Sequence, residues 1–166
     1  MKTEQCSHCE REANVITGSY RLDQMGLPVV LKNVELVKCD ECGTVEPIIP
    51  NLDGLMHSIA WTVISHECRL AGDEIRFLRK YLGLSTTEFT ELMHITKDCL
   101  SRWENGEDVG AQSDRLIRLV VLSKSKELRQ HIEEMMKMFP QLADKKRTGR
   151  KPELKIDSKT HEVVYA

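Results

Sequence analysis

The chain has 166 residues, of which 40% are hydrophobic and 30% charged, a composition typical of a globular protein with one or two small domains. No apolar run approaches the roughly 18–20 residues that span a bilayer, and no apolar stretch follows the N-terminus, so we expect a cytoplasmic protein without a membrane helix or signal peptide. The formal net charge of −2 excludes a uniformly basic nucleic-acid-binding protein, although it permits a local basic face.

Four of the six cysteines form two Cys-x-x-Cys pairs. The pairs are Cys6 with Cys9 and Cys39 with Cys42. A two-residue gap lets both sulfurs of one turn point at one centre, so two such turns supply four thiolates for a tetrahedral Zn²⁺. Gly43 suits the second turn because glycine adopts positive φ without strain, whereas Glu10 at the equivalent place of the first turn is a weaker match. We predict a structural zinc site, since four thiolates leave no position open for water.

Other chemistries of four cysteines stay open at this point. Disulfides need an oxidising compartment, which the expected lack of a signal peptide disfavours. A redox dithiol needs only one such pair and usually stands at the start of a helix that follows a strand. An iron–sulfur cluster also uses four cysteines, and the sequence does not distinguish it from zinc.

Two β-branched segments separate the cysteine pairs. Residues 15–22 and 29–37 partly alternate between apolar and polar side chains, with a turn signal at 25–28 between them. They predict an antiparallel sheet that brings the cysteine pairs together, and we assign residues 1–50 to a β-rich zinc-ribbon domain. Apolar residues at three- and four-residue steps then predict a linker helix within 51–71.

Short amphipathic helices follow as far as residue 139, whereas residues 154–157 and 163–165 are left open as short strands or none. The predicted helices cover 73–82, 86–93, 97–104 and 112–123, with a further one at 126–139. Ser85 and Glu88 form a capping box for the second of these helices, and Thr96 caps the third. We assign 72–123 to one helical domain and 124–166 to an extension with the last helix and a basic tail.

Residues 82–106, which end in Ser101-Arg102-Trp103-Glu104-Asn105-Gly106, resemble the helix-turn-helix of the Xre/Cro repressor family without gaps. With the four-cysteine ribbon ahead of it, the chain resembles, over residues 6–122, the MqsA-type antitoxins, also called the YgiT-type zinc-finger family. The resemblance implies an α+β, mainly α, fold: a zinc ribbon, a linker helix and a five-helix DNA-binding domain, here followed by a C-terminal extension.

The resemblance also implies a function. Such proteins are homodimeric repressors that bind a palindromic operator in double-stranded DNA and autoregulate their operon as the antitoxin of a type II toxin–antitoxin system. Their zinc-ribbon domain, which holds Zn²⁺, grips a partner toxin. The alternatives are a solitary zinc-containing transcriptional regulator and a protein-interaction adaptor that uses the zinc ribbon. The sequence contains no nucleophile–base pair, open metal site or phosphate loop, so we do not expect an enzyme.

Six residues are predicted to contact DNA. They are Thr86, Thr96, Lys97, Asp98, Ser101 and Arg102. In this motif the N-terminal half of the last helix lies against base edges in the major groove, where Arg102 suits guanine through two hydrogen bonds. Thr86 starts the preceding helix, where family members contact phosphate. The alternative is that Lys97 and Arg102 are only solvated surface charges.

Three residues depart from the family pattern. His94 replaces the usual glycine of the turn and must adopt positive φ at a modest cost. Thr90 replaces a small residue, often alanine. Asp98 stands where MqsA has a base-reading asparagine; a carboxylate accepts from cytosine N4 but cannot donate to adenine, so we expect a different operator.

The charge is unevenly spread over the predicted domains. Residues 72–123 carry a net −2, which weakens phosphate attraction, whereas residues 124–166 carry +4. We expect the basic tail either to add phosphate contacts or to stay solvated. Its cations are Lys145, Lys146, Arg147, Arg150 and Lys151.

Overall fold

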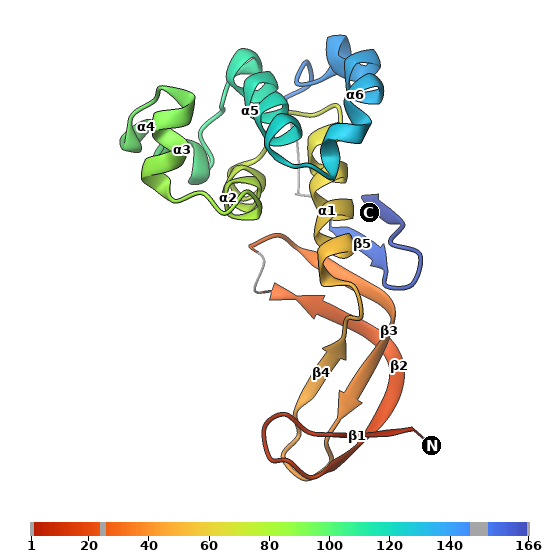
Figure 1. Cartoon of the computed structure of the whole chain (residues 1–166). Helices are drawn as coiled ribbons and strands as arrows, with labels where there is room; N and C mark the ends of the chain where they lie inside the picture. The colour runs from red at the N-terminus through yellow and green to blue at the C-terminus, as the bar shows by residue number, and fades with distance from the viewer. Residues whose placement is uncertain (1, 24–25, 147–152, 166) are drawn as a thin grey trace. The chain divides into compact units, whose positions relative to one another are not determined.

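The computed structural model describes residues 2–23, 26–146 and 153–165, and it shows the predicted α+β class. The chain separates into two compact units (Figure 1). The first holds the residues up to Leu55 together with the C-terminal strands, and the second holds the helical residues from Met56 onward. In the described part of the chain, no helix is long and apolar enough to cross a membrane.

A six-stranded sheet forms the first unit. Its strands are β1 (Thr3–Gln5), β2 (Glu12–Leu22), β3 (Val29–Lys38), β4 (Val45–Ile48), β5 (Leu154–Asp157) and β6 (Val163–Tyr165). Strands β2 and β3 are antiparallel, from Asn14 opposite Lys38 to Leu22 opposite Val29, so the predicted hairpin is confirmed. Of the turn predicted at 25–28, Met25 lies outside the described residues.

The C-terminal strands return to this sheet. Strand β5 runs parallel to β3, with the buried side chains of Leu154 and Ile156 opposite those of Val29 and Leu31. Strand β6 then pairs antiparallel with β5. The sequence division placed residues 124–166 in one consecutive segment, but these strands belong to the sheet unit, whereas the predicted linker helix belongs from Met56 onward to the helical unit.

In the described residues between β4 and β5, the chain forms six α-helices. They are α1 (Leu52–Ser65), α2 (Gly72–Tyr81), α3 (Thr86–Met93), α4 (Lys97–Glu104), α5 (Ala111–Lys124) and α6 (Ile132–Met138). The predicted bounds of α3 and α4 are confirmed to the residue. Residues 72–124 hold four helices and not the five that the resemblance implies. The helix predicted at 126–139 is confirmed only in its central part, α6, and the 3₁₀ turns η2 (Leu128–His131) and η3 (Phe139–Gln141) flank it.

Capping residues set the limits of α3 and α4. The Ser85 hydroxyl accepts from the Glu88 backbone N–H at 3.2 Å, and the Glu88 carboxylate accepts from the Ser85 backbone N–H at 2.8 Å, so the predicted capping box is confirmed. The Thr96 hydroxyl caps α4 by accepting from the Cys99 backbone N–H at 3.1 Å. Between the two helices, His94 ends α3 with a φ of 52°, the left-handed conformation predicted for this turn.

Helix α4 packs closely against the start of α2. A Cβ at Gly72 would lie 2.4 Å from the Trp103 carbonyl oxygen and 2.7 Å from that of Glu104, so the contact requires glycine. Burial works to raise the pKa of Glu104, but hydrogen bonds from Arg79 and Arg76 outweigh it and lower this pKa. The Glu104 carboxylate lies 2.8 Å from Arg79 Nε and 3.1 Å from Arg76 Nε, which ties the end of α4 to α2.

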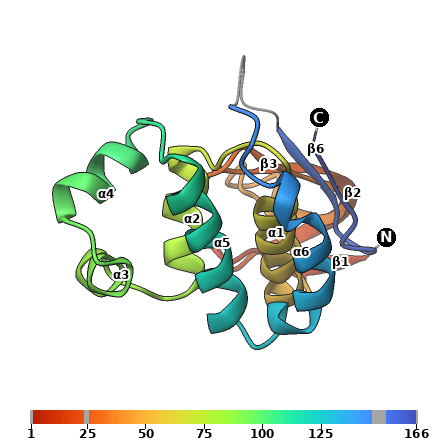
Figure 2. The same cartoon turned by 90° about the horizontal axis from the view of Figure 1, so that it is seen from above.

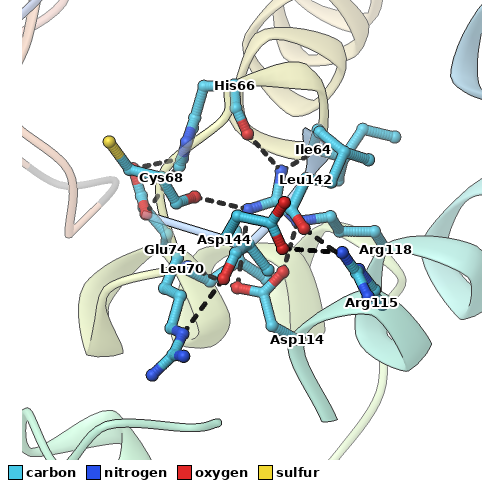
Figure 3. Close-up of polar contacts among 12 residues, drawn as sticks. Ile64, His66, Cys68, Leu70, Glu74, Asp114, Arg115, Arg118, Leu142 and Asp144 are labelled. Carbon is cyan, nitrogen blue, oxygen red and sulfur yellow. Dashed lines mark hydrogen bonds and ion pairs between the residues drawn. The ribbon is translucent and has the colours of Figure 1, made fainter. Parts of the chain in front are cut away.

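A fully buried ion pair joins α5 to the loop between α1 and α2 (Figure 3). Arg118 Nε lies 2.5 Å from Asp114 Oδ1. Asp114 Oδ2 also accepts from the Leu70 backbone N–H at 2.5 Å. The guanidinium donates, over 2.6–2.8 Å, to the carbonyl oxygens of Ile64 in the last turn of α1 and of His66 and Cys68 in the loop. The pair therefore holds the end of α1 and the loop that leads into α2.

The segment after η3 closes over the same loop. Its Ala143 backbone N–H donates to the Glu67 carbonyl oxygen at 3.0 Å, and the Arg69 backbone N–H donates to the Lys145 carbonyl oxygen at 3.0 Å. Arg115 of α5 holds this segment as well, through an ion pair of 2.8 Å with Asp144 (Figure 3). The loop between α1 and α2 is therefore held by α5 and by the segment that follows η3.

Removing one member of the buried pair should destabilise the protein strongly. We expect Arg118→Met to lower the free energy of unfolding by about 3–5 kcal/mol, because it leaves Asp114 as an uncompensated buried charge. Urea denaturation followed by circular dichroism measures the change. Lys124→Met is the matched control on the exposed end of α5 and should change the stability by less than about 0.5 kcal/mol. Equal stabilities of the two variants would contradict the assignment.

Candidate functional site

Two tight turns at one end of the sheet carry the four paired cysteines. The first turn follows β1 and the second follows β3. In each, the residue after the second cysteine donates its backbone N–H to the carbonyl of the first cysteine, at 2.9 Å from Glu10 to Cys6 and 3.0 Å from Gly43 to Cys39. Glu10 and Gly43 both have positive φ, 61° and 73°. Glu10 thus adopts the backbone conformation expected of glycine, at a cost of roughly 1–2 kcal/mol.

The pairing of β2 with β3 gathers the four sulfurs. The ligand atoms of Cys6, Cys9, Cys39 and Cys42 all lie within 4.8 Å of one another. The Sγ atoms are 3.5 Å apart in the Cys6–Cys42 pair and in the Cys9–Cys39 pair. Four thiolates bound to zinc at about 2.3 Å would form a tetrahedron with edges of roughly 3.8 Å. The cluster could therefore hold a metal ion such as zinc, in a set of soft sulfur ligands that suits it.

The thiols of the cluster differ in acidity. Hydrogen bonds from the side chain and backbone of Thr44 lower the pKa of Cys42 to about 6. At Cys9 the backbone of Arg11 works to lower the pKa, but burial and the neighbouring thiols outweigh it and raise the pKa to about 12. Such a cluster retains protons that a divalent cation would displace, so metal binding should release protons.

Contacts around the turns shield and brace the cluster. Cys6 and Cys39 are 2% and 1% exposed and pack against Ala13. The Ser7 hydroxyl donates to the Glu46 carboxylate at 2.6–2.7 Å and so joins the first turn to β4. An ion pair between Arg11 and Glu41 joins the two turns. The sequence did not reveal these partners of the turns, because each lies about 30 or more positions away in the chain.

The six residues predicted to contact DNA lie on α3, on α4 and in the turn between them. In both views these two helices lie on the opposite side of α2 and α5 from α6 (Figures 1 and 2). All six side chains belong to exposed residues, whereas Leu100 and Trp103 on the inner face of α4 are buried. The Thr96 hydroxyl is already engaged as the cap of α4. The Arg102 side chain is 63% exposed, and its Nε lies 3.6 Å from Glu107.

The cations of the basic tail are engaged where the structure describes them. Lys145 forms an ion pair with Glu67, and Lys146 Nζ lies 3.6 Å from Asp108. Arg147, Arg150 and Lys151, the other cations of the predicted phosphate contacts, lie outside the described residues.

No protein-family model, curated protein or solved structure matches the chain. The structure establishes an N-terminal four-cysteine cluster on a β-sheet, followed by a helical region. The Xre/Cro and MqsA-type assignments, with the DNA, dimer and toxin that they imply, stay predictions.

We expect one zinc ion per chain in freshly purified, reduced protein. Cys39→Ser should remove it, because the substitution takes a buried thiolate from the ligand set. Elemental analysis by mass spectrometry measures the metal content. Cys68→Ser and Cys99→Ser are the matched controls outside the cluster and should retain the metal. Protein without metal, or protein that contains iron with acid-labile sulfide, would contradict a zinc site.

Proposed function

We propose that the helical unit binds double-stranded DNA and that the chain is a sequence-specific transcriptional regulator, with α4 as the helix that enters the major groove. The observation that supports this proposal is the arrangement of α3, the turn at 94–96 and α4, in which the second helix exposes its N-terminal half. Helix-turn-helix proteins use this half of the recognition helix to contact base edges.

The exposed side chains of α4 offer complementary chemistry to a base pair. Among the described residues, Arg102 pairs only with Glu107, in an exposed ion pair of 3.6 Å that water and salt weaken, so the guanidinium is available to guanine O6 and N7. Asp98 presents a carboxylate that accepts from cytosine N4. Lys97 supplies a cation for a base or a phosphate at the same end of the helix.

The small number of free cations near α4 favours DNA binding by two copies of the recognition helix at once. Arg76 and Arg79 are occupied by Glu104, which leaves few free cations near α4 for phosphate. Because phosphate contacts supply much of the affinity for DNA, a single copy would bind weakly. A homodimer doubles the contacts and reads two half-sites about 34 Å apart, as a palindromic operator requires.

The finer assignment, an autoregulating repressor that serves as the antitoxin of a type II system, rests on the resemblance to MqsA-type proteins. In that assignment the four-cysteine sheet would bind a toxin, while in a solitary regulator or an interaction adaptor it would serve another partner. Purification of the chain together with the product of the adjacent reading frame distinguishes these roles. A small ribonuclease that co-purifies would support the antitoxin.

Arg102→Ala should abolish sequence-specific binding while the fold stays intact. The preferred duplex is first selected from random sequences with the wild-type protein. Loss of the two hydrogen bonds to guanine should then weaken binding to that duplex by about 10–100-fold, measured by gel shift at fixed salt. Arg21→Ala, which removes an exposed arginine from the sheet unit, is the control and should bind like wild type. The proposal fails if no duplex is enriched, or if Arg102→Ala retains both affinity and sequence preference.

A further inference from the structure

Helix α6 carries more apolar surface than it buries. Leu128 and Met135 are buried at 1% and 0% exposure, but Ile132 and Met136 are 49% and 54% exposed. The exposed pair recurs at a four-residue step, and Phe139 follows three residues later, so the three side chains share one side of the helix. Exposed apolar side chains that lie together mark a surface that another molecule covers.

The neighbours of α6 show where this side points. On one edge of the helix, the His131 ring stacks on Trp61 of α1 with ring centroids 4.5 Å apart. On the other edge, Arg115 of α5 lies over the Phe139 ring, 5.8 Å from its centroid. Arg115 of α5 therefore covers Phe139 just beyond the end of α6, and α1 is seen between α5 and α6 in Figure 2.

We call Ile132 and Met136, which lie one helical turn apart on α6, the α6 patch. The patch belongs to the helical unit alone. Ile132 and Met136 also lie outside residues 6–122, over which the chain resembles MqsA-type proteins.

One acid and one base flank the α6 patch, and they would complement those of a second copy of the chain related by a two-fold axis. Glu133 and Lys137 are both exposed and stand one helical turn apart on the outer side of α6. Among the described residues neither forms an ion pair, in contrast to Glu134, which pairs with His131 at 3.4 Å. When two copies of α6 run antiparallel, Glu133 of each lies opposite Lys137 of the other. The same arrangement brings Ile132 of each copy beside Met136 of the other.

We propose that the α6 patch binds a second copy of the chain through a two-fold, antiparallel contact between the two α6 helices. A symmetric interface must complement itself, and an apolar strip flanked by one acid and one base meets that condition. A binding partner of a strongly basic or acidic kind would find no matching charge there, since the two flanking charges cancel. The contact forms without DNA, so it is tested independently of the proposed function.

A charge placed in the patch should separate the two copies. We expect the wild-type protein to dimerise in analytical ultracentrifugation over a concentration series, and Met136→Glu to sediment as a monomer at the same concentrations. Leu52→Glu is the matched control, because Leu52 is also 54% exposed but lies outside the patch, and it should dimerise like wild type. Circular dichroism verifies that each variant is folded.

Exchange of the flanking charges tests the antiparallel arrangement. Lys137→Glu alone places two acids opposite each other at both ends of the contact and should weaken dimerisation about tenfold, and Glu133→Lys alone should do the same with two bases. A mixture of the two single variants should recover wild-type affinity as a heterodimer, because every acid then faces a base. A wild-type protein that is monomeric throughout, a Met136→Glu dimer, or a mixture without recovery would each overturn the proposal.

Discussion

The buried guanidinium of Arg118 organises the helical unit, because a cation without water must find all its partners within the protein. It finds them in Asp114, in a carbonyl oxygen at the end of α1 and in two carbonyl oxygens of the loop between α1 and α2. The loop held in this way places Gly72 against the end of α4. The approach is so close that a side chain at position 72 would clash with the Trp103 backbone. The exposed surface of α4 is thus positioned, through two successive contacts, by a charge that solvent does not reach.

The sheet unit depends on a different constraint, which is the register of β2 against β3. With Asn14 opposite Lys38, each strand leads at this end of the sheet into one of the two cysteine turns, and the four sulfurs meet. Within this close group of thiols, the pKa of Cys42 is lowered and that of Cys9 is raised. The group therefore retains a proton that a bound divalent metal ion would displace. The strained Glu10 backbone in the first turn is consistent with a site held together by such an ion.

The sequence predicted the features that local chemistry determines. The spacing of the cysteines and the capping residues Ser85 and Thr96 can be recognised within a few neighbouring residues. The structure contains the helices and the cluster that they predict. The features that sequence reasoning missed join distant residues. Asp114 and Arg118 look like a surface pair at i, i+4, but the structure buries them against the end of α1 and the loop that follows it, where their hydrogen-bond partners lie. The sequence left open whether residues 154–157 form a strand, and four residues with alternating character do not reveal a partner strand near the other end of the chain. Residues 126–139 were predicted as one helix, whereas the structure has α6 between two 3₁₀ turns, because 3₁₀ turns keep nearly the same apolar spacing as an α-helix.

We propose that the exposed side of α4 engages duplex DNA while the four-cysteine end of the sheet does not. The backbone amide signals of isotope-labelled protein, followed by nuclear magnetic resonance as a selected duplex is added, test this proposal directly. We expect the largest shifts on residues 96–102 and on Thr86, and we expect the signals of the two cysteine turns to stay in place. Shifts confined to the cysteine turns, or no shifts at α4 under conditions where the duplex binds, would contradict it.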